Sequence, residues 1–341
     1  MANGKSGRKG LGKILTTIIA IIILVVASVL GIDISNIIPD STTAPTQQQQ
    51  TQPIQNVEGQ LVVHMIDVGQ ADCFLLVQDD YTALIDCGTR STGKDAVEYI
   101  KQLGITQIDY VIGTHPHDDH MGGMYDIITN FEVGTVIIPD SRNGNITANW
   151  YMKLMSELKT GDYEVHYPTV GEVFNLEEAT MKVLAAETDV SNTNNYSIVL
   201  KVSFGQNDII MTGDAETEIE ELILKSGVDI DAEILKLGHH GSDTSNSEEF
   251  LDAISPEYGL ISAGIGNKYE HPIKEIMERL QKRDIEVYRT DESGSVIITI
   301  TADDITFSCE PGDYLSGVEL EKREGKWRVL QASIESKEKL L

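Results

Sequence analysis

The sequence predicts an α/β fold, an αββα sandwich in which two mixed β-sheets pack face to face with helices on both outer faces. Three observations predict it. Short β-branched runs alternate with helical patterns, this mixture occurs in two successive halves of the chain, and polar clusters fall where apolar strands end. Hydrophobic residues make up 41% of the 341 residues, which is ample for such a core.

The first half of the chain is dominated by short apolar runs. We expect strands at Leu61–Asp67, Cys73–Val77, Thr82–Asp86 and Tyr110–Gly113. Between the last two of these, Val97, Ile100 and Leu103 recur at helical spacing. This spacing predicts a helix at Asp95–Leu103.

The second half repeats the mixture of strands and helices. We expect strands at Thr180–Leu184, Ser197–Phe204, Asp208–Met211, Ala232–Leu237, Tyr258–Ser262, Glu286–Arg289 and Ser295–Ile300. We expect helices at Glu216–Lys225, Ser247–Ala253 and Ile273–Lys282. Beyond Pro311 the pattern weakens, and Lys326–Leu330 is a candidate for one more strand.

The N-terminal region predicts attachment to a membrane. Residues 14–32 are nearly all apolar and long enough to span a bilayer, and the preceding charges are all basic. We therefore expect a cytoplasmic tail at 1–13, a single transmembrane anchor at 14–32, a polar linker at 33–57, an extracytoplasmic domain at 58–310 and an extension at 311–341. The alternative is a signal peptide cleaved near Ala27, which would release a secreted protein.

The charge balance excludes one class of partner. Residues 33–341 carry 22 basic and 54 acidic side chains, a net charge of −32, and no basic stripe. Such a surface repels polyanions at long range. Tight nonspecific binding to nucleic acid is therefore not expected.

The three cysteines are too few and too scattered for a disulfide framework. A bridge between Cys73 and Cys87 stays open if their strands are neighbours. The simpler interpretation is that Cys73, Cys87 and Cys309 are small buried hydrophobic residues.

The segment with the most chemical information is Thr114–Gly123, which reads Thr-His-Pro-His-Asp-Asp-His-Met-Gly-Gly. Neutral imidazole and carboxylate are ligands for divalent zinc, manganese or iron. Because the segment follows an apolar strand, its side chains can converge. His115 and His117 are predicted to bind one ion, and Asp119 and His120 a second ion beside it.

Three further clusters also follow strands. Asp214 lies in a Gly-Asp pair before a helix, where it can bridge two cations or serve as an N-cap. In the pair His239 and His240, one ring can bind metal while the other transfers a proton. We also predict His271 as a ligand of the second ion, placed near an N-cap because Pro272 is expected to be the first residue of the next helix.

Taken together, the clusters identify a resemblance. His-x-His-x-Asp-His, Gly-Asp and the later histidines resemble the metallo-β-lactamase-fold superfamily. The motifs His64–Asp72, Leu84–Gly88, Asn194–Leu200, Gly238–Ser242 and Asn267–Pro272 resemble more narrowly the soluble domain of ComEC-type DNA-uptake proteins and their stand-alone relatives. The resemblance covers about residues 59–310, and it implies that fold, a hydrolase activity and two divalent ions, with zinc expected and manganese or iron as alternatives.

One departure from the superfamily bears on the substrate. Members that open β-lactams or thioesters usually supply a third histidine to the first ion from the region that is Asn194–Ser197 here. His166 lies upstream in the alternating run Tyr163–Tyr167 and is predicted to be a strand residue. We therefore expect His240, or else His239, to supply the third histidine ligand of the first ion. This pattern resembles the phosphodiester-cleaving branches.

The resemblance also suggests roles around the ligands. Carboxylates at the positions of Asp67 and Asp86 orient ligand histidines in the superfamily, and we expect the same of them here. Asn194, Asn195 and Ser197 contact a phosphate or line the site, or else form only a polar turn before a strand.

These predictions combine into one mechanism, a phosphodiester hydrolase in which a hydroxide held between two ions attacks phosphorus. Asp119 would orient the nucleophile and His239 would protonate the leaving oxygen. The substrate would be nucleic acid, a nucleotide, or a phosphodiester of a wall polymer or lipid. The alternatives are a lactonase or β-lactamase-like hydrolase and a non-catalytic, membrane-tethered binding module.

Overall fold

Two β-sheets form the centre of the protein, for which a computed structural model describes residues 59–144 and 146–326. The first sheet has the strand order β15-β14-β1-β2-β3-β4-β5-β6, and the second β13-β12-β11-β10-β9-β8-β7. The first comprises β1 (Leu61–Met65), β2 (Phe74–Gln78), β3 (Tyr81–Ile85), β4 (Gln107–Ile112), β5 (Glu132–Ile137), β6 (Glu164–His166), β14 (Val296–Ile300) and β15 (Ile305–Phe307). The second comprises β7 (Val173–Leu176), β8 (Ala179–Ala185), β9 (Val199–Phe204), β10 (Asn207–Met211), β11 (Ile234–Lys236), β12 (Tyr258–Ile261) and β13 (Glu286–Arg289).

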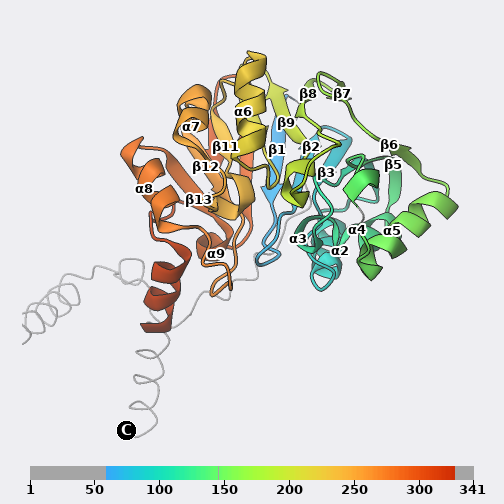
Figure 1. Ribbon diagram of the computed structural model, residues 1–341, viewed down its shortest axis with the longest axis horizontal. Coiled ribbons are helices and arrows are strands. Elements are labelled where there is room, and N and C mark those ends of the chain that lie inside the picture. The colour runs from blue at the N-terminus through green and yellow to red at the C-terminus, as the bar shows by residue number, and fades with distance from the viewer. Residues whose placement is uncertain (1–58, 145, 327–341) are drawn as a thin grey trace, which may run out of the picture. The chain divides into compact units, whose positions relative to one another are not determined.

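Helices cover the outer face of each sheet (Figure 1). On the first sheet these include α2 (Gly93–Gln102), α4 (Met124–Ile128) and α5 (Asn149–Thr160). On the second sheet they are α6 (Thr217–Ser226), α7 (Glu248–Ile254) and α8 (Lys274–Lys282). The short helix α3 (Asp118–Met121) follows strand β4 after the loop 113–117, and the short helix α9 (Thr290–Ser293) follows strand β13 directly.

The core consists of three apolar layers, which follow from the alternation of side chains along each strand. In β2, Phe74 and Leu76 face the layer between the two sheets, whereas Leu75 and Val77 face the helices outside. Strand β10 divides in the same way, with Ile209 in the central layer and Ile210 under the outer helices. This arrangement of helix, sheet, sheet and helix confirms the predicted αββα sandwich.

The predicted strands and helices are present, with ends that differ by a few residues. His166 lies in β6 as predicted. Helix α8 begins at Lys274 with Ile273 as its N-cap, so the prediction that Pro272 is its first residue was wrong. Extended backbone at Ile273 separates the proline from the helix. Lys326 lies in helical residues 317–326 rather than in a strand, and the rest of that predicted strand falls outside the described residues.

The cysteines are free, so the bridge that was left open between Cys73 and Cys87 is not formed. Both residues are fully buried, and burial raises the pKa of each thiol above its ordinary value. Cys309 is only partly buried and packs beside the central apolar layer. The two buried cysteines therefore act as small hydrophobic residues.

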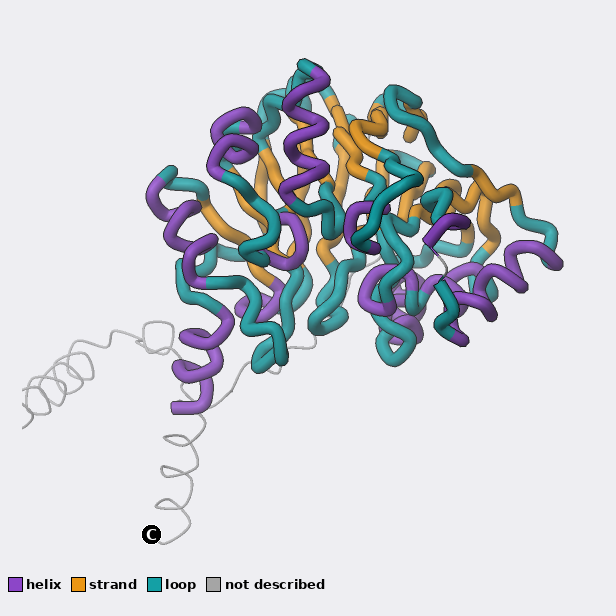
Figure 2. The backbone as a smooth tube through the Cα atoms, in the orientation of Figure 1, coloured by secondary structure: helices purple, strands orange, loops and turns teal. Residues whose placement is uncertain are grey.

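The strand directions bring the polar clusters to one edge of the fold. Strand β3 runs parallel to β4, and β10, β11, β12 and β13 run parallel to one another in the second sheet. The carboxyl ends of parallel strands lie at one sheet edge, where loops carry functional groups. Figure 2 shows these loops between the strands and the helices that follow them.

The described part of the C-terminal extension packs against this body. The buried side chain of Arg289 donates a hydrogen bond to the carbonyl of Asp313 at 3.2 Å. Leu320 is fully buried, and the backbone N–H of Gly317 donates to the carbonyl of Pro272 at 2.9 Å. Residues 313–320 therefore lie against the loop that carries His271.

The predicted tail, anchor and linker at 1–13, 14–32 and 33–57 lie outside the described residues. Within residues 59–144 and 146–326, no helix combines the length and apolar composition needed to cross a bilayer. Membrane attachment therefore remains a prediction.

Buried His64 in β1 is expected to make the fold less stable in acid. Its ring is 2% exposed, Nδ1 lies 3.0 Å from the hydroxyl of Tyr99, and burial lowers its pKa to about 4. Between pH 6.5 and 4 the unfolded chain binds a proton that the folded chain does not, so stability falls as the pH falls. The loss is about 3 kcal/mol when complete.

Urea unfolding at pH 7 and pH 4.5 measures this contribution. His64→Gln cannot titrate and is expected to lose less stability between the two pH values than the wild type. Equal losses in both proteins would show that His64 does not contribute to the pH dependence.

Candidate metal centre

Histidine and aspartate side chains from several strand ends converge on one small volume. Donor atoms of His115, His120 and Asp214 lie within 4.8 Å of one another, and so do those of Asp119, His120 and His240. Two further groups of this kind include Asp72. Because the groups share members, they form one continuous cluster that is consistent with a binuclear metal site.

The two histidines of the His-x-His motif face each other. His115 Nε2 lies 3.0 Å from His117 Nδ1. Two nitrogens bound about 2.0 Å from one tetrahedral zinc ion would be separated by roughly 3.3 Å. The two nitrogens form a hydrogen bond that is close to this spacing, and their predicted role as ligands of one ion remains a prediction.

His120 is oriented by the carboxylate of Asp86. His120 Nδ1 lies 2.7 Å from Asp86 Oδ2, and the same carboxylate accepts hydrogen bonds of 2.8 Å from the N–H and the hydroxyl of Thr114. Since an ionised carboxylate only accepts, the proton of a neutral His120 ring sits on Nδ1. The lone pair of Nε2 then faces Asp214 at 3.1 Å.

Asp67 does not share that role. Its side chain is exposed, and its Oδ1 accepts a hydrogen bond from the N–H of Gly69 at 3.0 Å. The expectation that Asp67 orients a ligand histidine is therefore not supported. The chain continues past the end of β1 before turning back, and Asp72 is the carboxylate that reaches the histidines.

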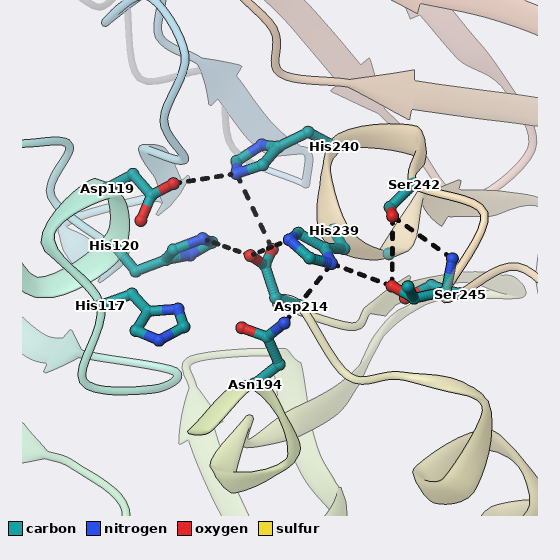
Figure 3. A network of polar contacts seen from close by, with 12 residues as sticks. His117, Asp119, His120, Asn194, Asp214, His239, His240, Ser242 and Ser245 are labelled. Atoms are coloured by element: carbon teal, nitrogen blue, oxygen red, sulfur yellow. Dashed lines mark hydrogen bonds and ion pairs between the residues drawn. The ribbon is translucent and has the colours of Figure 1, made fainter. Parts of the chain in front are cut away.

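Asp214 lies at the centre of the cluster, and its two oxygens face different rings (Figure 3). Oδ2 lies 3.1 Å from His120 Nε2 and 3.8 Å from His115 Nε2. Oδ1 lies 3.9 Å from His240 Nε2. The carboxylate is 1% exposed, and its N–H donates to the hydroxyl of Ser197 at 3.0 Å. Asp214 thus lies between histidines assigned to both ions, and its bridging role remains a prediction.

The loop that carries His239 and His240 is backbone-strained. Both residues have positive φ angles, 51° and 54°, which side-chain-bearing residues rarely adopt. Buried Asn246 fixes the loop, since its side chain accepts from the N–H of Gly238 at 2.8 Å and donates to the carbonyl of Gly238 at 2.9 Å. Such strain occurs where surrounding contacts hold a functional geometry.

The position of His240 differs from the prediction, which placed it with His115 and His117 at the first ion. Its Nδ1 hydrogen-bonds the carbonyl of Ser262 at 2.9 Å, so in the neutral ring Nδ1 carries the proton and the lone pair is on Nε2. Nε2 lies 3.6 Å from Asp119 Oδ2. The geometry therefore groups His240 with Asp119 and His120, the residues expected at the second ion, rather than with the His-x-His pair expected at the first.

We call the partly exposed edge of the cluster, where His239 lies, the rim. His239 and His271 lie beside one another there. Their ring centroids are 5.3 Å apart, and His239 Nε2 lies 3.7 Å from Asp214 Oδ2. The side chain of His239 is 23% exposed, so it is more accessible than that of His240 at 2%. His271 is buried with Nδ1 unpaired, and its role as a ligand of the second ion remains a prediction.

The polar turn at residues 194–197 mainly organises the Asp214 loop. Asn195 accepts a hydrogen bond from the N–H of Glu216 at 3.0 Å, and Ser197 accepts that of Asp214. Asn194 alone also approaches the rim, where its Nδ2 lies 3.5 Å from His239 Nδ1. Asn195 and Ser197 are thus placed for a structural role, and Asn194 for one at the site.

Two residues of the cluster were missed by the sequence analysis. Asp72 lies within the His64–Asp72 motif but was assigned no role, although it is 1% exposed and contacts His240. Lys236 is 1% exposed in the apolar strand β11, 2.6 Å from Asp72. A charged residue inside a short apolar strand was the signal that could have revealed it.

Three carboxylates of the cluster, those of Asp72, Asp119 and Asp214, have pKa values below their ordinary value although they are buried, whereas burial raises the pKa of Asp86. Burial alone would raise the pKa of Asp214, but His120 and His240 hold it well below its ordinary value. Burial likewise opposes a charge on His240, yet Asp214 and Asp72 raise its pKa to about 9. Divalent ions would displace such imidazole protons on binding and neutralise the carboxylates in their place.

Unpaired buried atoms provide an independent test of whether this cluster suits metal ions. Within the part of the chain that the structure describes, several buried atoms of the cluster make no hydrogen bond: Asp72 Oδ1, His120 Nε2, Asp214 Oδ1, His240 Nε2 and His271 Nδ1. Buried polar atoms usually have partners. Imidazole nitrogens and carboxylate oxygens left unpaired at one place are the donor set that zinc, manganese or iron would take.

Comparison with known proteins places this arrangement in a family. The profile of the Metallo-beta-lactamase superfamily matches residues 66–265. This chain belongs to the metallo-β-lactamase superfamily. The match includes the His-x-His-x-Asp-His motif, Asp214 and the pair His239 and His240, while His271 lies beyond it.

The metallo-β-lactamase-fold domain also has relatives among competence proteins. It is 31% identical over 263 residues to ComE operon protein 3 of Bacillus subtilis, covering 72% of this chain and 33% of that protein. It is 30% identical over 242 residues to competence protein ComA of Neisseria gonorrhoeae, covering 70% and 32%. This chain therefore spans about a third of the length of these curated relatives. The solved structure of YhfI, a metallo-β-lactamase fold protein from Bacillus subtilis, superposes with a TM-score of 0.48 at 12% identity, covering 74% of this chain and 100% of that one.

Proposed function

We propose that this protein is a binuclear metal-dependent hydrolase that cleaves phosphodiesters, and that residues 14–32 attach it to the outer face of the cytoplasmic membrane. The observation that carries the proposal is the position of Asp214, whose buried carboxylate lies within 4 Å of histidines of both groups: Oδ2 is close to His115 and His120, and Oδ1 is close to His240. A purely structural metal site closes with four ligands and needs no bridging carboxylate. Two overlapping donor groups around one carboxylate favour catalysis over structure.

The residues at the rim suggest why the substrate is a phosphodiester. Asn194 stands beside His239, in the region where lactam-opening members of the superfamily carry an additional histidine. A phosphodiester is itself an anion, so it would favour a pair of cations recessed in an otherwise acidic surface. Both features agree with a phosphodiesterase.

The side chains of the cluster divide the work of hydrolysis. Two divalent ions, when bound, lower the pKa of water and neutralise charge on the phosphoryl oxygens. Asp119 lies at the cluster with its side chain 26% exposed, where it can orient the attacking water. His239 reaches the same place from the opposite side, with Nδ1 3.1 Å from the hydroxyl of Thr244, and can donate a proton to the leaving oxygen.

A substrate screen with a matched variant tests this proposal. The zinc- or manganese-loaded wild type is expected to hydrolyse bis(p-nitrophenyl) phosphate faster than a chromogenic cephalosporin or a lactone. Asp119→Ala is expected to lower that turnover by at least about a hundredfold, because the water loses both its orientation and a nearby charge.

Two outcomes of the screen would overturn the proposal. Preferential opening of the cephalosporin or lactone would identify the enzyme as an amide or ester hydrolase. Equal, background-level turnover of every substrate by wild type and Asp119→Ala would identify a non-catalytic binding module.

A further inference from the structure

Lys236 is a buried lysine that lies directly behind the candidate metal centre. Its Nζ lies 2.6 Å from Asp72 Oδ2 and 3.9 Å from Asp214 Oδ1, and it donates a hydrogen bond to the carbonyl of Gly213 at 2.9 Å. Transfer of an ammonium group out of water costs several kcal/mol unless oxygens of the protein compensate. Lys236 therefore depends on these oxygens, two of which belong to the Gly213–Asp214 turn.

Asp72 lies between Lys236 and the two histidines His120 and His240. Its Oδ1 lies 3.3 Å from His240 Nδ1, and its Oδ2 lies 3.7 Å from His120 Nδ1. These are the ring nitrogens that point away from Asp214, since Nε2 of each ring faces it. Asp72 thus lies on the side of the two rings that faces away from Asp214.

The geometry leaves two possible roles for Asp72. Its oxygens lie within 4.8 Å of donor atoms of Asp214 and His240, so by distance alone it could bind an ion itself. However, the ammonium of Lys236 pairs with Oδ2 at 2.6 Å, and a cation so close to the carboxylate opposes a second cation at either of its oxygens, including the unpaired Oδ1. The contacts therefore favour a supporting role over ligation.

We propose that Lys236 and Asp72 form a positioning pair that keeps Asp72 out of the metal coordination and leaves Asp214 free to bridge. Asp72 lies against the Nδ1 side of the His240 and His120 rings, whose Nδ1 atoms hydrogen-bond Ser262 and Asp86, and it adds negative charge beside them. Lys236 neutralises Asp72, and its hydrogen bond to the carbonyl of Gly213 helps to keep the ammonium beside Asp72 rather than on the carboxylate of Asp214. Outer contacts of this kind commonly tune metal affinity.

Zn²⁺ affinity of the full chain, measured against a competing chromophoric chelator, tests the pair without reference to any substrate. Asp72→Asn preserves the shape of the side chain but removes its charge. The ammonium of Lys236 would then turn to Asp214 Oδ1, and we expect Zn²⁺ affinity to fall about 10- to 100-fold.

The double variant shows whether Asp72 supports the metal ligands or is itself a ligand. Asp72→Asn combined with Lys236→Met leaves no buried ammonium to compete for Asp214, and the asparagine oxygen still faces His240. Zn²⁺ affinity is therefore expected to return to within about threefold of the wild type, a strongly non-additive result. If Asp72 were a ligand, the double variant would bind Zn²⁺ as weakly as Asp72→Asn alone, and the proposal would be wrong.

A spectroscopic readout and a control complete the experiment. In Lys236→Met, Asp72 is free to reach an ion, so the visible absorption of the Co²⁺-loaded protein is expected to change, and the double variant should restore the wild-type spectrum. Lys201→Met removes another buried lysine of the same sheet, whose Nζ lies 2.9 Å from Asp208 Oδ2. It should lower the melting temperature of the metal-free protein without changing Zn²⁺ affinity.

The outcomes also separate this inference from the proposed function. Zn²⁺ binding that is equal in the wild type, Asp72→Asn and the double variant would overturn the positioning pair alone. A wild-type chain that binds no Zn²⁺, Mn²⁺ or Fe²⁺ would overturn both. Asp72→Asn is the deciding single variant, because its near-identical shape favours folding even where Lys236→Met fails to fold.

Discussion

Replacing Asp214 with asparagine is expected to lower phosphodiester turnover at least about a thousandfold and to reduce the bound metal from two ions toward one. The carboxylate is fully buried, with Oδ2 close to His115 and His120 and Oδ1 close to His240. Asparagine keeps the shape but has one oxygen and no charge, so it cannot bridge two cations. Mass spectrometry of metals in dialysed protein, beside steady-state kinetics, measures both effects.

Asp208 offers a matched control for this variant. It is a partly buried aspartate of the same sheet, paired with Lys201 at 2.9 Å and remote from the cluster in β10. Asp208→Asn is expected to keep two ions and near-normal turnover. Asp214→Asn with two tightly bound ions and nearly unchanged kcat would contradict the bridging role.

Replacing His239 with glutamine is expected to slow hydrolysis according to the leaving group. For a diester with an alkyl alcohol as leaving group, turnover should fall about 10²- to 10⁴-fold, because a general acid typically accelerates such a reaction by that factor. For bis(p-nitrophenyl) phosphate the loss should be small, because nitrophenolate leaves without a proton. The metal content should not change, since His239 is assigned to proton transfer.

A histidine outside the cluster provides the control for His239→Gln. His166 in β6 pairs with Glu172 at 2.7 Å and is half-exposed, so His166→Gln should leave turnover of both diesters unchanged. Loss of an ion in His239→Gln would instead make His239 a metal ligand. An equal slowing of both diesters would also contradict its role as the acid.

Much of this site was predictable from the sequence because its motifs are local. His115, His117, Asp119 and His120 lie within six residues, and the short loop after β4 forces them together. Asp214 likewise follows β10 directly. Where a strand ends, its chain direction is known, and the order of parallel strands brings those ends to one edge.

The remaining features depend on long-range packing that spacing cannot reveal. His240 groups with Asp119 because residues of positive φ turn its ring toward the carbonyl of Ser262, a contact made across β11 and β12. Asp67 and Asp72 both follow β1, and only the path of the loop decides which reaches the histidines. Strand β5 and helix α5 were not predicted at all, since no chemical motif drew attention to them.

The charge distribution connects the fold to the proposed activity. Residues 33–341 carry a net charge of −32, and several ionised carboxylates of the buried cluster are part of that surplus. Bound cations would reverse the sign of the charge at the metal centre, so that it attracts an anionic diester. Activity should therefore depend on metal loading more steeply than the stability of the sheets does.

Anomalous diffraction from crystals of the chain, collected at the absorption edge of the bound metal, tests the central claim most directly. The account predicts two peaks a few ångströms apart on either side of Asp214, one beside His115 and His117 and the other beside Asp119, His120 and His240. A single peak with four closed protein ligands, or no peak in metal-saturated crystals, would contradict it.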